Sequence, residues 1–312
     1  MTAFILRRLL GTIPIILLVG IITFFLVQLS PGDPAMFYVS ADAPVEEIER
    51  VRERLGLDQG IMTRFGFWIS EVLRGNLGIS FHQNRPVLTG FLDALPVTLW
   101  LAFYSLIIAL LVGIPVGLLS ALRPNGLVDR FSTVFVFIGV SMPNFWLGML
   151  LVLLFAVTLG LLPAQGYDGT NMWTGFRSLL LPAITLGYSQ AALIARMTRS
   201  SMLEVMRQDY VQTARAKGLR TPVVLGKHAF GNALNPIVTV VGLAIGSLAA
   251  GSAVVEVVFN LPGIGRLVVD SVMRRDYPMI QGILLLTAGM IILVNLLTDL
   301  LYAILDPRIR YD

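Results

Sequence analysis

The 312-residue chain is 56% hydrophobic and only 13% charged, whereas an average soluble chain carries about 25% charged residues. It has no cysteine, which excludes disulfide frameworks, thiolate metal sites and cysteine nucleophiles, and its two histidines leave little material for histidine catalysis. The net charge of +4 is small, and in a chain with long apolar blocks its distribution matters more than its sum. These totals predict a protein that lies largely within a lipid bilayer.

The first expected element is a membrane-spanning helix. The apolar run Leu9–Leu29 has 21 residues, which is longer than the roughly 7–15 residues of a signal-peptide core. No small-x-small cleavage pattern follows it. We therefore interpret this run as a retained first helix.

Residues 30–96 form an expected extracytoplasmic loop with two amphipathic helices. The first begins near Pro44 and carries acidic residues in its first turn. The second contains Phe65 and Trp68 and stops at Gly75. Two interpretations remain open: these helices bind the membrane surface or a partner, or they pack as a lid on the rest of the protein.

Six apolar runs are long enough to cross a bilayer, which takes about 20 residues. We predict an all-α integral membrane protein with six transmembrane helices. Its parts are residues 1–29 with the first helix, the loop 30–96, and a five-helix core 97–312 that includes a polar cytoplasmic loop, 199–230. The runs are Leu9–Leu29, Val97–Leu119, Phe131–Leu162, Leu179–Ala195, Leu234–Val255 and Ile280–Leu305.

Small residues and prolines interrupt the spans. Gly113 and Gly117 allow a neighbouring helix to approach closely. Pro143 removes one backbone hydrogen bond in the third run, and this is tolerated where protein or a hydrated cavity satisfies the freed carbonyl. The break is either a packing kink or part of a helix that lines a pathway. The pathway-lining candidates are Ser141, Pro143, Asn144 and Trp146.

The polar passage "DYVQTARAKGLRTP", Asp209–Pro222, lies between two apolar runs. We expect a short helix with Asp209 as its N-cap, Gly218 at its end and Pro222 preventing continuation. Tyr210, Ala214 and Gly218 then share one shallow face, because positions i, i+4 and i+8 align on a helix. Such a helix either docks into a groove on a cytoplasmic partner or merely fixes the topology of the chain.

Charged residues within the spans are almost absent. Asp299 lies in the sixth run and Glu256 directly follows the fifth. We interpret both as interfacial carboxylates, with a gate or partner contact as the alternative for Glu256. A stand-alone ion-coupled transporter would have to use Asp299. An intramembrane enzyme would need a histidine–nucleophile set, paired intramembrane acids or metal ligands at useful spacing, and the sequence offers none of these. The chain also lacks a GxxxxGK[ST] loop for ATP.

The distribution of Lys and Arg predicts that both termini face the cytoplasm, since six spans place them on one side. The expected inner segments carry 13 Lys and Arg, and the two short outer segments carry four. The loop 30–96 is left out of this comparison because loops beyond about 60 residues do not follow the rule.

The polar passage and its continuation, "DYVQTARAKGLRTPVVLGKHAFGNALNP", closely resemble the cytoplasmic coupling loop of ABC importer permeases of dipeptide, oligopeptide, glutathione and nickel systems. The resemblance covers almost the whole chain in order and favours the permease with the long first outer loop. Other similar stretches are "FILRRLL", "LSPGDPA", "GNLGISF", "GIPVGLLSA", "SMPNFWLG", "RMTRSSMLEV", "EVVFNLPGIGRLVVDSVMRRDYPMIQG" and "LVNLLTDLLYAILDPRIR".

The resemblance implies a type I importer permease fold in a prokaryotic plasma (inner) membrane. A second homologous permease subunit completes the pathway as a heterodimer, two ATP-binding subunits use ATP and Mg²⁺, and an extracytoplasmic binding protein delivers the cargo. The chain itself is then no enzyme and binds no cofactor, metal or nucleic acid. Short peptides are the first expected cargo, with glutathione and nickel chelates as alternatives.

The resemblance also assigns roles to residues. The segment "NLPGIGRLVVDSVMRRDYP" caps the pathway or meets the binding protein, with a re-entrant loop held by Arg–Asp pairs as a further interpretation. The outer gate or binding-protein candidates are Glu256, Arg266, Arg274, Arg275 and Asp276. The ATPase-coupling candidates are Asp209, Tyr210, Ala214, Arg215, Ala216, Lys217, Gly218 and Arg220.

The chain departs from the general family pattern at three places, two of which resemble the peptide-permease variant and leave the family assignment unchanged. The general loop begins Glu-Ala-Ala, whereas this chain has Gln212, Thr213 and Ala214, so Gln212 does not inherit the role of the glutamate. Pro236 lies five residues later than the general pattern expects, as in the peptide-permease variant. Asn76 stands where the family more often has an aspartate, which puts a charge-dependent role there in doubt.

Overall fold

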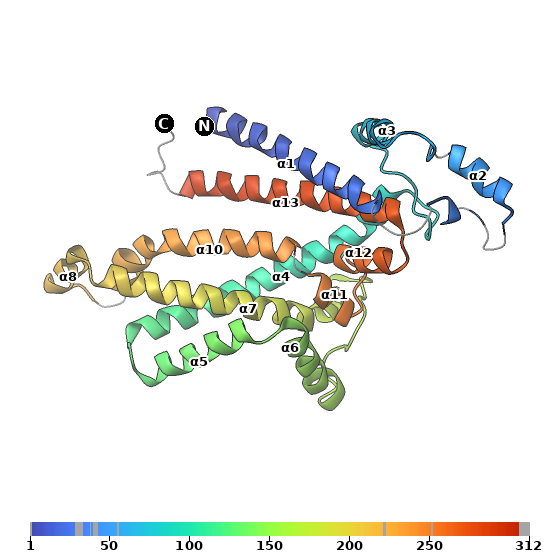
Figure 1. Cartoon of the computed structure of the whole chain (residues 1–312). Coiled ribbons are helices and arrows are strands. Elements are labelled where there is room, and N and C mark those ends of the chain that lie inside the picture. The colour runs from blue at the N-terminus through green and yellow to red at the C-terminus, as the bar shows by residue number, and fades with distance from the viewer. Residues whose placement is uncertain are drawn as a thin grey trace. The chain divides into compact units, whose positions relative to one another are not determined.

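The computed structural model describes residues 2–28, 34–37, 39, 43–54, 56–220, 223–250 and 252–305. The described elements are helices, and Figure 1 shows their course. An isolated bridge joins Ile79 and Pro86. The elements are α1 (Thr2–Gln28), η1 (Pro34–Phe37), α2 (Val45–Arg54), α3 (Ile61–Leu73), α4 (Val87–Leu122), α5 (Leu127–Ser141), α6 (Asn144–Leu151), η2 (Val152–Thr158), α7 (Met172–Met206), α8 (Asp209–Ala216), η3 (Val224–Phe230), α10 (Gly231–Ala250), α11 (Ala253–Val258), α12 (Ile264–Met273) and α13 (Tyr277–Leu305).

The chain divides into two compact units. The first comprises Met1–Leu95 and Leu267–Ile292, and the second comprises Pro96–Arg266 and Leu293–Asp312. Two long helices, α4 and α13, and the short helix α12 therefore contribute to both units.

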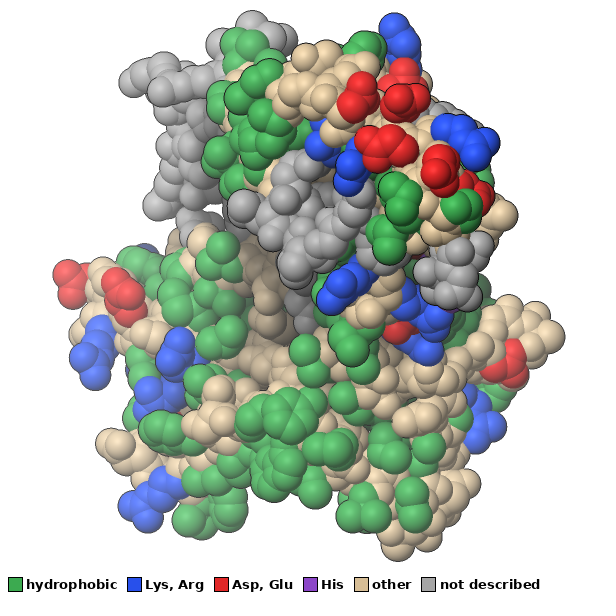
Figure 2. Space-filling view, turned by 45° about the vertical axis from the view of Figure 1, so that its right-hand side comes forward, with side chains coloured by type: hydrophobic (Ala, Val, Ile, Leu, Met, Phe, Trp, Pro, Cys, Tyr) green, Lys and Arg blue, Asp and Glu red, His purple; other side chains and the backbone are tan. Residues whose placement is uncertain are grey.

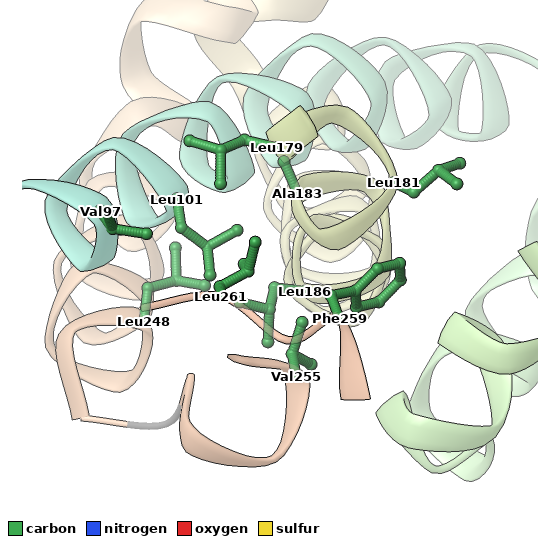
Figure 3. Close-up of a cluster of buried hydrophobic side chains, with 10 residues drawn as sticks. All are labelled: Val97, Leu101, Leu179, Leu181, Ala183, Leu186, Leu248, Val255, Phe259 and Leu261. Atoms are coloured by element: carbon green, nitrogen blue, oxygen red, sulfur yellow. The ribbon is translucent and has the colours of Figure 1, made fainter. Parts of the chain in front are cut away.

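Helix α7 is the centre of the second unit, where it packs against α5, α6 and α10 (Figure 1). Its most apolar stretch is 67% buried, so its side chains contact protein more than lipid. The cluster in Figure 3 joins α4, α7, α10 and the α11 region through apolar side chains. Its members are Val97, Leu101, Leu179, Leu181, Ala183, Leu186, Leu248, Val255, Phe259 and Leu261.

The close approach of two helices at Gly113 and Gly117 is confirmed. A Cβ atom on Gly113 would lie 2.7 Å from the carbonyl oxygen of Ala191, and one on Gly117 would lie 2.5 Å from that of Ala195. Both partners are on α7, so the two glycines of α4 let the α4 and α7 backbones touch.

The third expected span is interrupted at Pro143, as the sequence predicts, and the structure shows that the interruption is a sharp break. Helix α5 and the segment Asn144–Thr158 are bent by 109° relative to each other. Met142, the residue between α5 and Pro143, has an extended backbone with φ −82° and ψ 124°. The cause is steric, because the proline ring disfavours helical geometry in the residue that precedes it.

The expected six spans are only partly reproduced as continuous helices. Within the described residues, three helices are long and apolar enough to cross a membrane, namely Val87–Leu122, Met172–Met206 and Tyr277–Thr298. Counting each of two bent helix pairs as one span raises the number to five. The apolar part of α1, Leu10–Phe25, is shorter.

Many large apolar side chains are exposed. On α5, Phe131 is 74% exposed and Phe137 is 66% exposed. Figure 2 shows hydrophobic side chains over much of the visible face. Soluble monomers rarely expose so much apolar surface, whereas a protein surrounded by lipid does.

In the first unit, α3 packs on α1 through an aromatic cluster. The ring centroid of Phe24 lies 5.2 Å from that of Phe65 and 5.6 Å from that of Trp68. Arg74 caps α3, and Gly75 with φ +81° ends it as expected. The packing interpretation therefore holds for Phe65 and Trp68.

Candidate functional site

Helix α8 follows α7 directly at the end opposite the Asn171 cap (Figure 1). Gln208 is its N-cap, so the expectation that Asp209 caps the helix is wrong. Asp209 is instead the first helical residue, where a negative charge favours the positive end of the helix dipole. Gly218 has φ +76°, a conformation that suits glycine, and it ends the helix as expected. Pro222 lies outside the described residues.

One face of α8 is packed against its own chain. Val211 is fully buried and Ala214 is 5% exposed, and both pack with Val224 of η3 and with Val205 of α7. The expected docking face of Tyr210, Ala214 and Gly218 is therefore wrong for Ala214. The i, i+3 pair of Val211 and Ala214 forms the apolar stripe, and such a stripe turns toward protein.

The remaining coupling candidates are exposed and form the free surface of α8 and the turn after it. They comprise an acidic start, a half-exposed aromatic ring and a basic end. These residues are Asp209, Tyr210, Arg215, Ala216, Lys217, Gly218 and Arg220. We call them the α8 surface. The α8 surface is the outward side of a helix whose opposite face packs on α7 and η3.

An ion pair ties α7 to α5 near the same end of α7. Arg199 donates from Nε to Asp129 Oδ1 at 2.6 Å and from Nη2 to Oδ2 at 2.8 Å. Asp129 also accepts hydrogen bonds from the Ser120 hydroxyl at the end of α4 and from the Asn125 amide. Three helices thus meet at one carboxylate that is 4% exposed. Sequence analysis did not single out Asp129 or Arg199, since each resembled an ordinary loop-flanking charge.

The pathway candidates surround the break between α5 and α6. Ser141, Pro143 and Trp146 are exposed, and Asn144 is half-buried. On the other side of α6, Gly148 packs against Phe259, whose Cε2 would lie 2.9 Å from an added Cβ. The four candidates therefore lie on a surface that this unit leaves uncovered, and their role in a pathway stays a prediction.

Glu256 is not an interfacial carboxylate, because its side chain is fully buried. Its Oε1 accepts hydrogen bonds from the hydroxyls of Thr98 at 2.8 Å and Ser252 at 2.6 Å. Its Oε2 accepts from the backbone amide of Arg266 at 3.0 Å. Glu256 therefore fastens the turn after α11 to α4, and burial removes it as a direct contact for a binding protein.

In the first unit, Asp276 is 2% exposed and, like Glu256, its carboxylate holds neighbouring segments together. It accepts hydrogen bonds from the Ser80 hydroxyl and from the amides of Phe81 and His82, and its own carbonyl begins α13. Arg274 contacts the ring of His82. Arg274 and Arg275 are exposed and remain candidates for an outer contact. Arg266 belongs to the second unit, beside Glu256.

Among the described residues, no group of three or more His, Asp or Glu side chains is placed to hold a metal ion. What stands out among the described residues is a polar helix, α8, packed on the central α7.

Comparison with known protein families gives two matches along the chain. Residues 113–311 match the family described as binding-protein-dependent transport system inner membrane component. Residues 1–102 match the family of the N-terminal part of such membrane components.

Relatives match the chain over its full length. A probable peptide ABC transporter permease protein, y4tP, of Sinorhizobium fredii (strain NBRC 101917 / NGR234) is 44% identical over 313 residues, covering 100% of both chains. The glutathione transport system permease protein GsiC of Escherichia coli (strain K12) is 43% identical over 311 residues, again covering 100% of both chains.

The fold is also similar to solved structures. An inward-facing structure of the MetNI methionine ABC transporter matches with a TM-score of 0.59 at 20% identity, covering 70% of this chain and 97% of that chain. At this identity the likeness concerns the fold alone, which is that of a type I importer permease. Together with the apolar helices, these matches make the chain a multi-pass inner-membrane permease and not an enzyme. The chain belongs to the family of binding-protein-dependent transport system inner membrane components, as a permease subunit of an ABC importer.

Proposed function

We propose that this chain forms half of the translocation pathway of an ATP-driven importer for short peptides. A second, homologous permease subunit completes the pathway as a heterodimer. Two ATP-binding subunits use ATP and Mg²⁺ beneath it, and an extracytoplasmic binding protein delivers the peptide. Both termini face the cytoplasm. The full-length similarity to peptide permeases supports the cargo, and the placement of α8 supports the coupling.

The observation that carries the coupling is the two-sided character of α8. One face, with Val211 and Ala214, is buried against α7 and η3, and the other exposes Tyr210, Arg215 and Lys217. An ATP-binding subunit that binds the exposed face moves α8 and α7 together, because the buried apolar contact between the two helices is close-packed. Since α7 packs on α5, α6 and α10, its movement repositions the whole second unit.

The exposed surface around the break at Pro143 then forms part of the wall of the pathway. Ser141, Asn144 and Trp146 offer a hydroxyl, an amide and an indole on an exposed surface, next to helices that α7 carries. Such groups bind the peptide bonds and side chains of varied peptides without demanding one sequence. On the outer side, Arg274 and Arg275 are the contacts that we assign to the binding protein.

Glutathione is the second candidate cargo, because a relative named as a glutathione permease is 43% identical over the whole chain. A nickel chelate is a further alternative. Uptake of a labelled dipeptide into vesicles that hold the importer and its binding protein, in competition with longer peptides, glutathione or nickel, ranks these cargoes. ATP-dependent uptake of the dipeptide that peptides inhibit at lower concentration than glutathione or nickel supports the proposal, and stronger inhibition by glutathione or nickel than by any peptide contradicts the peptide cargo.

The coupling is tested by reversing two charges of the α8 surface, Arg215→Glu together with Lys217→Glu. We expect ATP-dependent uptake to fall by about tenfold or more, because like charges at a contact cost several kcal/mol. Membrane insertion should be unchanged, since both side chains are exposed. Arg123→Glu, an exposed cation on the turn between α4 and α5, serves as the matched control. Unchanged uptake in the double variant would contradict the proposal.

A further inference from the structure

A cavity of about 280 Å³ opens in the second unit between α4, α5 and α7. One part of its wall is apolar and the other part is polar. The apolar part is Val116, Val136, Phe137, Val140 and Ala195, and the polar part is Ser120, Ser132, Thr133, Arg196 and Arg199, with Gly117 between them. We call this cavity the α5–α7 groove.

The charges of the groove do not cancel. Arg199 is neutralised by its two hydrogen bonds to Asp129. Arg196 is exposed, and in the part of the chain that the structure describes its guanidinium has no hydrogen bond or ion pair. The groove therefore presents one uncompensated positive charge.

A second polar group also lacks a partner. Ser132 is only 9% exposed and lines the groove, yet among the described residues its hydroxyl takes part in no hydrogen bond. The other hydroxyls are occupied, because Ser120 donates to the Asp129 carboxylate and Thr133 donates to the Asp129 carbonyl at 2.8 Å. Because this hydroxyl is not among the fully enclosed unpaired groups of the described residues, it is open to the groove and can hydrogen-bond a partner from outside the chain.

The two parts of the groove follow the depth of the membrane. Arg196 directly follows the apolar run that ends at Ala195, which places it where the bilayer core gives way to headgroups. From Ser132 to Val140, α5 rises about 12 Å at 1.5 Å per residue, toward the bilayer interior. The polar end thus lies at headgroup level and the apolar end among acyl chains.

We propose that the α5–α7 groove binds one anionic glycerophospholipid. Its phosphate pairs with Arg196 and accepts a hydrogen bond from the Ser132 hydroxyl, and an acyl chain lies against Val136, Phe137 and Val140. Basic pockets between transmembrane helices are recurrent sites for anionic headgroups. A bound lipid fills the space between α5 and α7 beside the Asp129–Arg199 pair, and so stiffens the helix that carries α8.

The test uses the assembled importer, purified in detergent and depleted of lipid. Phosphatidylglycerol, phosphatidylcholine with the same acyl chains, and inorganic phosphate are titrated separately, with bound lipid counted by native mass spectrometry and stability followed by thermal unfolding. We expect one tightly bound phosphatidylglycerol, and no stabilisation by phosphatidylcholine or phosphate at equal concentration. Equal retention of both lipids, or stabilisation by phosphate alone, would overturn the proposal.

Two variants localise the lipid. Arg196→Gln should weaken phosphatidylglycerol binding by about tenfold, the loss expected for one charge-assisted contact. Val136→Trp should displace the acyl chain by filling the groove. Arg207→Gln, an exposed cation at the end of α7 that does not line the groove, should bind lipid as the unaltered chain does. Full lipid binding by both groove variants would show that the lipid binds elsewhere on the importer, and would refute the site.

Discussion

Replacing Gly117 by alanine tests the close contact of α4 with α7. Two effects oppose each other. Alanine favours an α-helix over glycine by about 1 kcal/mol. Against this, the new Cβ would lie 2.5 Å from the Ala195 carbonyl oxygen and 2.6 Å from Thr198 Cβ. Ordinary contact begins at 3.4 Å, so the helices would have to separate by several tenths of an ångström.

The clash should win because its partner is backbone. A flexible side chain could turn aside, but the Ala195 carbonyl cannot move without α7. Overpacking of this kind costs about 1–3 kcal/mol, and a backbone partner places Gly117→Ala at the upper end. After the helix gain is subtracted, a net loss of about 1–2 kcal/mol remains. For a chain of this size that lowers the unfolding temperature by about 2–8 °C.

The assay is thermal unfolding of the purified permease subunit in detergent, followed by tryptophan fluorescence. Gly289→Ala is the matched control, because this glycine of α13 would gain a Cβ with no atom within 4 Å. We expect the control to unfold at the same temperature as the unaltered chain or above it. If Gly117→Ala raises the unfolding temperature as Gly289→Ala does, the helices are not in contact there and the reasoning is refuted.

Three further predictions follow from the buried contacts. Arg199→Ala should lower the free energy of unfolding by about 2–3 kcal/mol in thermal unfolding, because it leaves the Asp129 carboxylate buried without its cation. Adding Asp129→Asn to this variant should restore part of the loss. If the losses of the two single variants simply add in the double variant, the pairing is contradicted. Glu256→Gln should cost about 1–3 kcal/mol, since the carboxylate accepts three hydrogen bonds and the amide has only one acceptor oxygen; an unchanged unfolding temperature would argue against these hydrogen bonds. Val211→Ala should loosen α8 and lower the uptake per ATP hydrolysed, whereas the neighbouring Gln212→Ala, whose side chain is exposed, should not; equal coupling in both variants would contradict the rigid attachment.

Local features of the fold could be predicted because each depends on residues that lie close together in the sequence. The apolar runs marked α4 and α7, the glycines Gly113 and Gly117 marked the close approach, and Gly218 marked the end of α8. The break at Pro143 was expected as an interruption. Its size, a bend of 109°, was not, because the packing of α6 on α7 and α11 determines it.

Contacts between distant residues could not be predicted. Asp129 and Arg199 are 70 positions apart, and Thr98 and Glu256 are 158 positions apart. Without knowledge of which helices adjoin, Asp129 was not singled out, and Glu256 was interpreted as an interfacial carboxylate, which its burial reverses. The orientation of α8 was missed for a related reason. Small residues suggested a docking face, but Val211 decides which side of the helix turns inward.

The most direct test of the coupling uses the absence of cysteine from the chain. A single cysteine at Ala216 on the α8 surface carries a photoactivatable cross-linker, and Met62→Cys on the exposed side of α3 is the control. In membranes that contain the whole importer, illumination should join Ala216 to an ATP-binding subunit, with a yield that changes when ATP is added, and should leave Met62 unjoined to that subunit. No adduct at Ala216, or an equal adduct from Met62, would contradict the account that ATP-driven movement enters this permease through α8.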